Sequence, residues 1–157
     1  MVGVNNDATE PRSPAELIDR IERSWQAWVA AVEGIPDNRL AEPIVGHWST
    51  KDLLGHVAFW EEWVIGDCRR IEADEPETGE ETDPINQGQV AENKDSSVAE
   101  QKRYRQAAHA NLIAYLGSIA ATEPTFPALV KALEGETWGH YDEHAAEVLK
   151  WRSAEGL

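Results

Sequence analysis

The sequence predicts an all-α protein, a four-helix bundle with a long crossover between the second and third helices. Four segments carry apolar residues at the 3, 4 and 7 spacings of a helix, and we find no alternation typical of strands. Three of these segments begin with a serine in a capping position. A chain of 157 residues is long enough for a single domain with a substantial core. Amphipathic helices without a sheet bury their apolar faces against one another, which favours a bundle.

The first helix is expected to begin after Ser13, with Pro14 at its first position and Glu16 completing a capping box. Its apolar stripe runs to Val32, and Gly34 then ends it. The loop that follows, up to residue 48, shows no strand pattern.

The second helix is expected from Ser49, with Asp52 three residues later. Its stripe consists of Leu53, Val57, Trp60, Val64, Cys68 and Ile71. The acidic segment 72–83 contains little that is apolar, so we interpret it as a solvated crossover rather than a site.

A short helix is predicted within the crossover, at about residues 83–92. Ser97 and Glu100 form a further capping box at the start of the third long helix. Residues 128–133 are expected to form one or two turns, and the fourth long helix to span about residues 136–152. The domain is thus expected at residues 13–153, between a disordered tail at 1–12 and a short tail at 154–157.

Composition narrows the classes of partner. There are 14 Lys and Arg residues against 29 Asp and Glu, a net charge of -15, so we expect no nucleic-acid partner. No apolar stretch is long enough to span a bilayer, the start does not have the pattern of a signal peptide, and the single cysteine cannot form an internal disulfide. We therefore expect a cytoplasmic protein without a membrane partner. A homodimer is also expected, because two-fold dimers are the commonest oligomers.

Three histidines are the candidate metal ligands. His140 and His144 are one turn apart and share a helix face, and His56 lies at the edge of the apolar stripe on another helix. Three imidazoles leave a coordination position open, and zinc, nickel and iron all accept such ligands. The alternative is a chance pair of partly buried histidines. We interpret His47 as a loop residue and His109 as a surface or hydrogen-bonded one.

Further residues are candidates for a pocket beside the histidines. Trp60, Trp63 and Tyr141 could form apolar walls, although each could equally be ordinary core. No general base is evident on the inward faces. Glu61 and Glu143 are candidates only because they are close to the histidines in the sequence.

Two motifs resemble the DinB superfamily. They are the run from Trp48 to Val57, which contains His56, and the run from His140 to His144. The resemblance covers roughly residues 13–152, and the segment containing Asn86, which we count with the pocket, is similar to the ClbS/DfsB-type subgroup. It implies an up-down-down-up bundle with a divalent metal bound by the three histidines.

The resemblance also implies an activity. Members of the superfamily include metal-dependent transferases of low-molecular-weight thiols, and ClbS-like members that hydrolyse a reactive cyclopropane in a toxin. We therefore expect a metal-dependent enzyme that activates a thiol or water against a small electrophile, in detoxification or self-resistance. A low-molecular-weight thiol is then a possible cosubstrate. The alternative is a metal-loaded protein that binds or sequesters a small molecule without catalysis.

Overall fold

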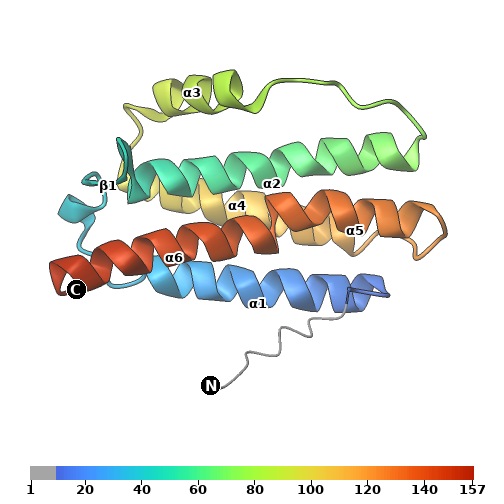
Figure 1. Cartoon of the computed structure of the whole chain (residues 1–157), viewed down its shortest axis with the longest axis horizontal. Helices are drawn as coiled ribbons and strands as arrows, with labels where there is room; N and C mark the ends of the chain where they lie inside the picture. Colours follow the sequence, from blue (N-terminus) through green and yellow to red (C-terminus); the bar gives the residue numbers. More distant parts are fainter. Residues whose placement is uncertain (1–9) are drawn as a thin grey trace.

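The computed structural model describes residues 10–157, and residues 1–9 of the predicted tail lie outside this range. Its elements, in order, are α1 (Pro14–Val32), a short 3-10 helix (Asp37–Arg39), β1 (Pro43–Val45), β2 (Trp48–Ser49), α2 (Thr50–Glu72), α3 (Thr82–Asn93), α4 (Val98–Leu116), α5 (Thr125–Glu136) and α6 (Trp138–Glu155). The four longest helices run lengthwise through the molecule, α2 and α4 in one direction and α1 and α6 in the other (Figure 1). The predicted all-α class is confirmed.

Local capping explains where the long helices begin. Ser49 and Asp52 form a reciprocal capping box at α2, and Ser97 and Glu100 form another at α4. At α1 the Ser13 side chain accepts from the Glu16 backbone N–H as predicted. The Glu16 carboxylate, however, accepts from the backbone N–H of Arg12 rather than that of Ser13. Each cap satisfies N–H groups that have no partner inside the helix.

The core lies between the long helices, where α1 packs chiefly on α6 and α2 packs on α4 and α5. Its wholly buried members come from every long helix and include Leu17, Trp28, Leu54, Leu112, Tyr141 and Val148. Gly55 allows α4 to approach α2 closely, because a Cβ atom there would lie 2.4 Å from Gln101 Oε1. Burial of this apolar surface is the main force that holds the bundle together.

The long crossover between α2 and α4 is also confirmed, and α3 lies within it on the outside of α2 (Figure 1). No residue of α3 is buried. Two hydrogen bonds connect this region to α2: Trp60 Nε1 donates to Asn86 Oδ1 (2.9 Å), and Lys51 Nζ donates to the Lys94 carbonyl (3.1 Å). Two polar contacts therefore help to attach the crossover to the bundle.

The structure differs from the sequence prediction in several places. A small antiparallel pair, β1 and β2, precedes α2, although the loop had no strand alternation. Two strands this short leave almost no pattern in the sequence. Helix α5 is longer than the one or two turns predicted, and α6 runs from Trp138 to Glu155 rather than from 136 to 152. Within residues 10–157 no helix is both long and apolar enough to cross a bilayer. The dimer and the cytoplasmic location stay predictions.

Candidate metal centre

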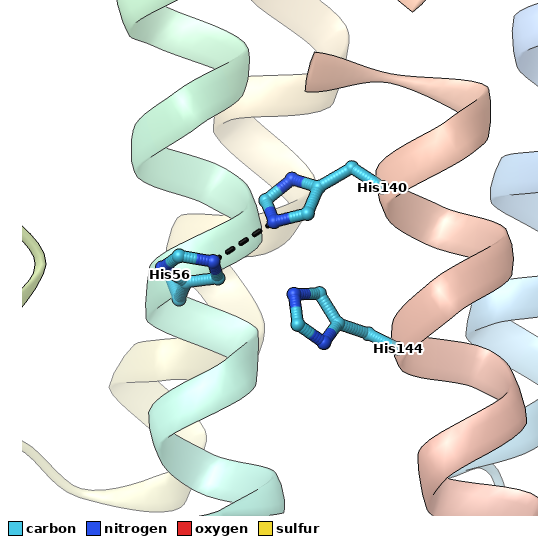
Figure 2. Close-up of side chains that lie close together, drawn as sticks. All are labelled: His56, His140 and His144. Atoms are coloured by element: carbon cyan, nitrogen blue, oxygen red, sulfur yellow. Dashed lines mark hydrogen bonds between the residues drawn. The ribbon is translucent and has the colours of Figure 1, made fainter. Parts of the chain in front are cut away.

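His56 on α2 meets His140 and His144 on α6 in the interior of the bundle (Figure 2). The Nε2 atoms of His56 and His140 are 2.8 Å apart, and one ring nitrogen from each of the three histidines lies within 4.8 Å of the others. The residues are only 8 to 9% exposed. The structure therefore brings together the three residues that the sequence offered as ligands.

Hydrogen bonding orients one of these rings. His144 Nδ1 donates to Glu147 Oε2 at 2.6 Å, and Glu147 lies three residues later on the same helix. With its proton on Nδ1, the ring presents the Nε2 lone pair, which is buried and has no partner within residues 10–157. Histidines that bind a metal commonly donate a hydrogen bond from their other ring nitrogen to a carboxylate, because this bond fixes the tautomer and the ring orientation.

The donor set fits a divalent metal. A tetrahedral ion with bonds of about 2.0–2.1 Å holds its ligand nitrogens about 3.3 Å apart, close to the 2.8 Å between His56 and His140. Three neutral imidazoles suit zinc, nickel and iron, and leave a fourth position open. Without a shared proton or cation, two lone pairs at this distance would repel each other. His56, His140 and His144 are thus the residues that could hold the ion.

Burial also keeps two of the rings neutral. Desolvation, with a smaller contribution from His144, lowers the pKa of His56 to about 3. Desolvation, followed by His144 and His56, lowers the pKa of His140 to about 2, with the Glu136 backbone acting in the opposite direction. A histidine must be neutral to bind a metal, so both are competent ligands across the physiological range.

A cavity of about 190 Å³ opens directly onto two of the three histidines. Its lining consists of His56 and His144 together with Val45, Trp48, Leu53, Asn86 and Glu147. Trp48 packs edge-on against His56, with ring centroids 4.9 Å apart. A second cavity, of about 370 Å³, shares Trp48 and Asn86 with the first. Asn86, which we expected in the pocket, therefore lies beside the candidate metal centre.

Sequence reasoning did not assign four residues of this cavity to the site, namely Val45, Trp48, Leu53 and Glu147. Trp48 was visible as the first residue of the motif that contains His56. Glu147 follows His144 by three residues, a spacing that places both on one helix face, so an i, i+3 search would have found it. Neither signal was used.

The predicted pocket aromatics lie elsewhere. Trp60 has its ring centroid 6.5 Å from that of His56, but with Trp63 it lines a separate cavity of about 350 Å³ beneath the acidic linker. Tyr141 is wholly buried in the core, where its hydroxyl donates to Glu61. For Tyr141 the reason is rotational position, because it directly follows His140 and successive residues point about 100° apart around a helix. Trp60 and Trp63 instead lie about one and two turns beyond His56 along α2.

The two candidate bases also have different surroundings. Glu143 is exposed on α6. Glu61 is wholly buried, and Oε1 accepts from Tyr141 (2.5 Å) and from His109 Nδ1 (2.7 Å). Desolvation raises the pKa of Glu61, while its hydrogen bonds act in the opposite direction. His109, only 5% exposed, is a hydrogen-bonded core residue rather than a surface one.

The fold and the site together define a helical-bundle protein with a candidate three-histidine metal centre. The chain belongs to the DinB superfamily, whose family pattern matches residues 20–151. The predicted family is thereby confirmed. No curated protein sequence matches the chain.

Three solved structures share the fold. An uncharacterised protein from Escherichia coli UTI89 matches with a TM-score of 0.77 and 16% identity, covering 94% of this chain and 96% of that one. DfsB, described as a sibling lethal factor precursor, has a TM-score of 0.77 and 16% identity over 93% and 98% of the two chains. The colibactin self-resistance protein ClbS, in complex with double-stranded DNA, has a TM-score of 0.74 and 17% identity over 91% and 97%. At this identity the likeness establishes a common fold.

One expectation is wrong. We excluded nucleic-acid partners because the net charge is -15. The ClbS structure holds double-stranded DNA on the same fold, which overturns that exclusion. The physical reason is that net charge is a sum over the whole surface, whereas binding depends on the local arrangement of charges.

Proposed function

We propose that this protein is a metal-dependent enzyme acting on a small electrophilic substrate, either as a thiol S-transferase or as a hydrolase, in detoxification or self-protection. The observation that carries the proposal is the convergence of three buried imidazoles beside a cavity. Three neutral imidazoles are costly to bury unless they have partners. A divalent ion is the partner that satisfies all three.

Four residues of the chain would bind the metal or orient its ligands. His56, His140 and His144 hold the ion, and Glu147 keeps the His144 ring in its binding orientation. When bound, a divalent metal on three neutral histidines supplies a positive charge that lowers the pKa of a water or thiol and so favours the nucleophile.

The cavity walls suit a small and largely apolar substrate. Val45, Trp48 and Leu53 supply apolar surface next to the histidines. The side-chain oxygen of Asn86 is engaged by Trp60, which leaves the amide NH₂ to donate to a polar group of the substrate. A volume of about 190 Å³ lies below the range of roughly 300–1,000 Å³ found for drug-sized ligands, so either the substrate is small or it extends into the adjoining cavity.

A second candidate is a metal-loaded protein that sequesters a small molecule. Glu147 is the one carboxylate among the described residues that line the cavity, and its Oε2 already accepts from His144. The lining therefore offers no separate general base. This observation favours binding without turnover.

The experiment that separates the two is an activity assay on protein of measured metal content. Epoxides, cyclopropanes and maleyl compounds would be offered with and without a low-molecular-weight thiol. Turnover that needs the thiol supports transfer, and turnover without it supports hydrolysis. Binding of an electrophile without conversion in either condition would leave the sequestration protein. Protein purified with ample metal that carries no stoichiometric ion would rule out both.

Glu147→Ala is expected to weaken metal affinity by about 10- to 100-fold, because His144 loses the carboxylate that fixes its tautomer. Competition with a chromophoric chelator would measure the change. Glu143→Ala is the matched control, since Glu143 is an exposed glutamate on the same helix. Equal affinities in the two variants would show that Glu147 does not support the site.

A further inference from the structure

We propose that a chain of four side chains, the partly exposed Glu22 and the buried His109, Glu61 and Tyr141, positions the metal-binding face of α6 against α2. We call these four residues the core polar network. The inference rests on the proposed function, because it concerns the same three histidines. None of its members is among the candidate ligands, so each acts on the centre through Tyr141 and the helix that carries it.

The core polar network links all four long helices. Tyr141 on α6 donates its hydroxyl to Glu61 Oε1 on α2 (2.5 Å), and the same oxygen lies 2.7 Å from Nδ1 of His109 on α4. The other ring nitrogen of His109, Nε2, lies 2.9 Å from Glu22 Oε1 on α1. Trp25 stacks on the His109 ring at 3.9 Å between centroids and 11° between planes. The imidazole is therefore held on both edges and over one face.

Stability alone does not account for this arrangement. Glu61 is wholly buried, and its Oε2 has no hydrogen-bond partner in the described part of the chain. Arg105, 6% exposed, lies near enough to attract it, but Arg105 Nε and Nη1 are also unpartnered there. A buried ionic network of this kind is often no more stable than apolar residues of the same volume. Its best-attested use is to fix the register of packed helices.

The network contacts α6 through Tyr141, which lies between the two candidate ligands His140 and His144 in the sequence. Tyr141 follows His140 directly and precedes His144 by three residues. Successive residues lie about 100° apart around a helix, so anchoring Tyr141 on one side restricts the rotation of α6 about its axis. That rotation decides whether the two histidines point at α2 or past it.

The anchor and the third ligand also belong to one rigid element. Glu61 lies five residues after His56 on α2. Fixing Tyr141 on Glu61 therefore sets the position of His140 and His144 relative to His56, with no loop in between. His109 on α4 in turn holds the Glu61 carboxylate, and Glu22 on α1 holds the other edge of the His109 ring. Tyr141 and Glu61 are thus positioning residues of the centre.

Tyr141→Phe tests the proposal, because it removes one hydroxyl and keeps the ring in the core. Tyr104→Phe is the matched control: Tyr104 donates its hydroxyl to Glu62, also across α4 and α2, but at an exposed contact outside the core. We would measure cobalt and zinc affinity by chelator competition, and the visible absorption spectrum of the cobalt-loaded protein. Thermal unfolding of each variant would be recorded in parallel.

For Tyr141→Phe we expect a loss of metal affinity on the order of tenfold and a changed cobalt spectrum, since the ligands are less well oriented. Tyr104→Phe should match the wild type in both. Glu61→Gln keeps the shape of the side chain and should show the same loss of metal affinity and the same change in cobalt spectrum. If Tyr141→Phe fails to fold, Glu61→Gln provides the test of the positioning role.

Two results would overturn the positioning role. One is wild-type affinity and spectrum in a folded Tyr141→Phe protein. The other is a lower melting temperature with metal affinity and cobalt spectrum both unchanged, which would indicate that the network only stabilises the bundle. If the wild-type protein itself binds neither cobalt nor zinc, the metal centre fails and the positioning role fails with it.

Discussion

His140→Ala is expected to remove stoichiometric metal from the purified protein and to abolish any metal-dependent turnover, while the helices stay folded. The variant leaves two ligands where a metal site usually needs three or more. The His140 ring has no role in a helix cap, and its close polar contact is with His56 Nε2. Metal analysis and far-ultraviolet circular dichroism would measure the two effects. His47→Ala, on an exposed loop residue, is the control and should keep its metal.

A packing residue in α2 should give the opposite result. Leu54 is wholly buried two residues before His56, and Leu54→Ala is expected to cost about 2–5 kcal/mol of unfolding free energy. It should nevertheless retain the metal, whereas His56→Ala should lose it at little cost in stability. Full metal content in His140→Ala or His56→Ala would contradict the three-histidine centre.

Mild acid is expected to destabilise the metal-free protein strongly. Burial lowers the pKa of His56 to about 3 and of His140 to about 2, from 6.5. Below pH 6.5 these two histidines therefore bind protons in the unfolded chain but stay neutral in the native state. The unfolding free energy consequently decreases as the pH falls from 6.5 toward 3. At pH 5 the loss amounts to about 2 kcal/mol for each histidine.

Urea unfolding at pH 7, 6 and 5 in the presence of a chelator would measure the effect. Burial raises the pKa of Glu61 and Glu136, and these carboxyls therefore act in the opposite direction. The informative quantity is the change in unfolding free energy between pH 7 and pH 5, compared between wild type and His56→Leu. The variant should lose about half of the pH dependence that the two histidines cause. His47→Ala should keep the full pH dependence. The same pH dependence in wild type and His56→Leu would show that His56 is not kept neutral by the fold.

Much of the fold could be predicted because helix signals are local. Ser49 with Asp52, and Ser97 with Glu100, mark helix starts through contacts three residues apart. The β1–β2 pair could not be predicted, since five strand residues hold too little pattern to exceed the noise. The length of α5 was underestimated because its end depends on packing against α2 and α6.

The candidate site was predictable to the extent that it uses helical spacing. His140 and His144 share a face by periodicity, His56 lies at the edge of the apolar stripe of another helix, and the resemblance to the DinB superfamily added the segment of Asn86. Tyr141 shows the limit of this reasoning. Its place beside two candidate ligands suggested a pocket wall, but its rotational position directs it to Glu61 in the core.

The sequence by itself determined the helices, their apolar faces and the three histidines, because capping and periodicity act within a few residues of one another. Only the tertiary structure decided which polar side chains meet. His109 lies 87 residues from Glu22 and 48 from Glu61 in the chain, yet it contacts both. No sequence pattern that spans a few residues predicts these contacts, because they depend on how the four helices are rotated when their apolar faces pack. The same packing brings His56 within 2.8 Å of His140, 84 residues away.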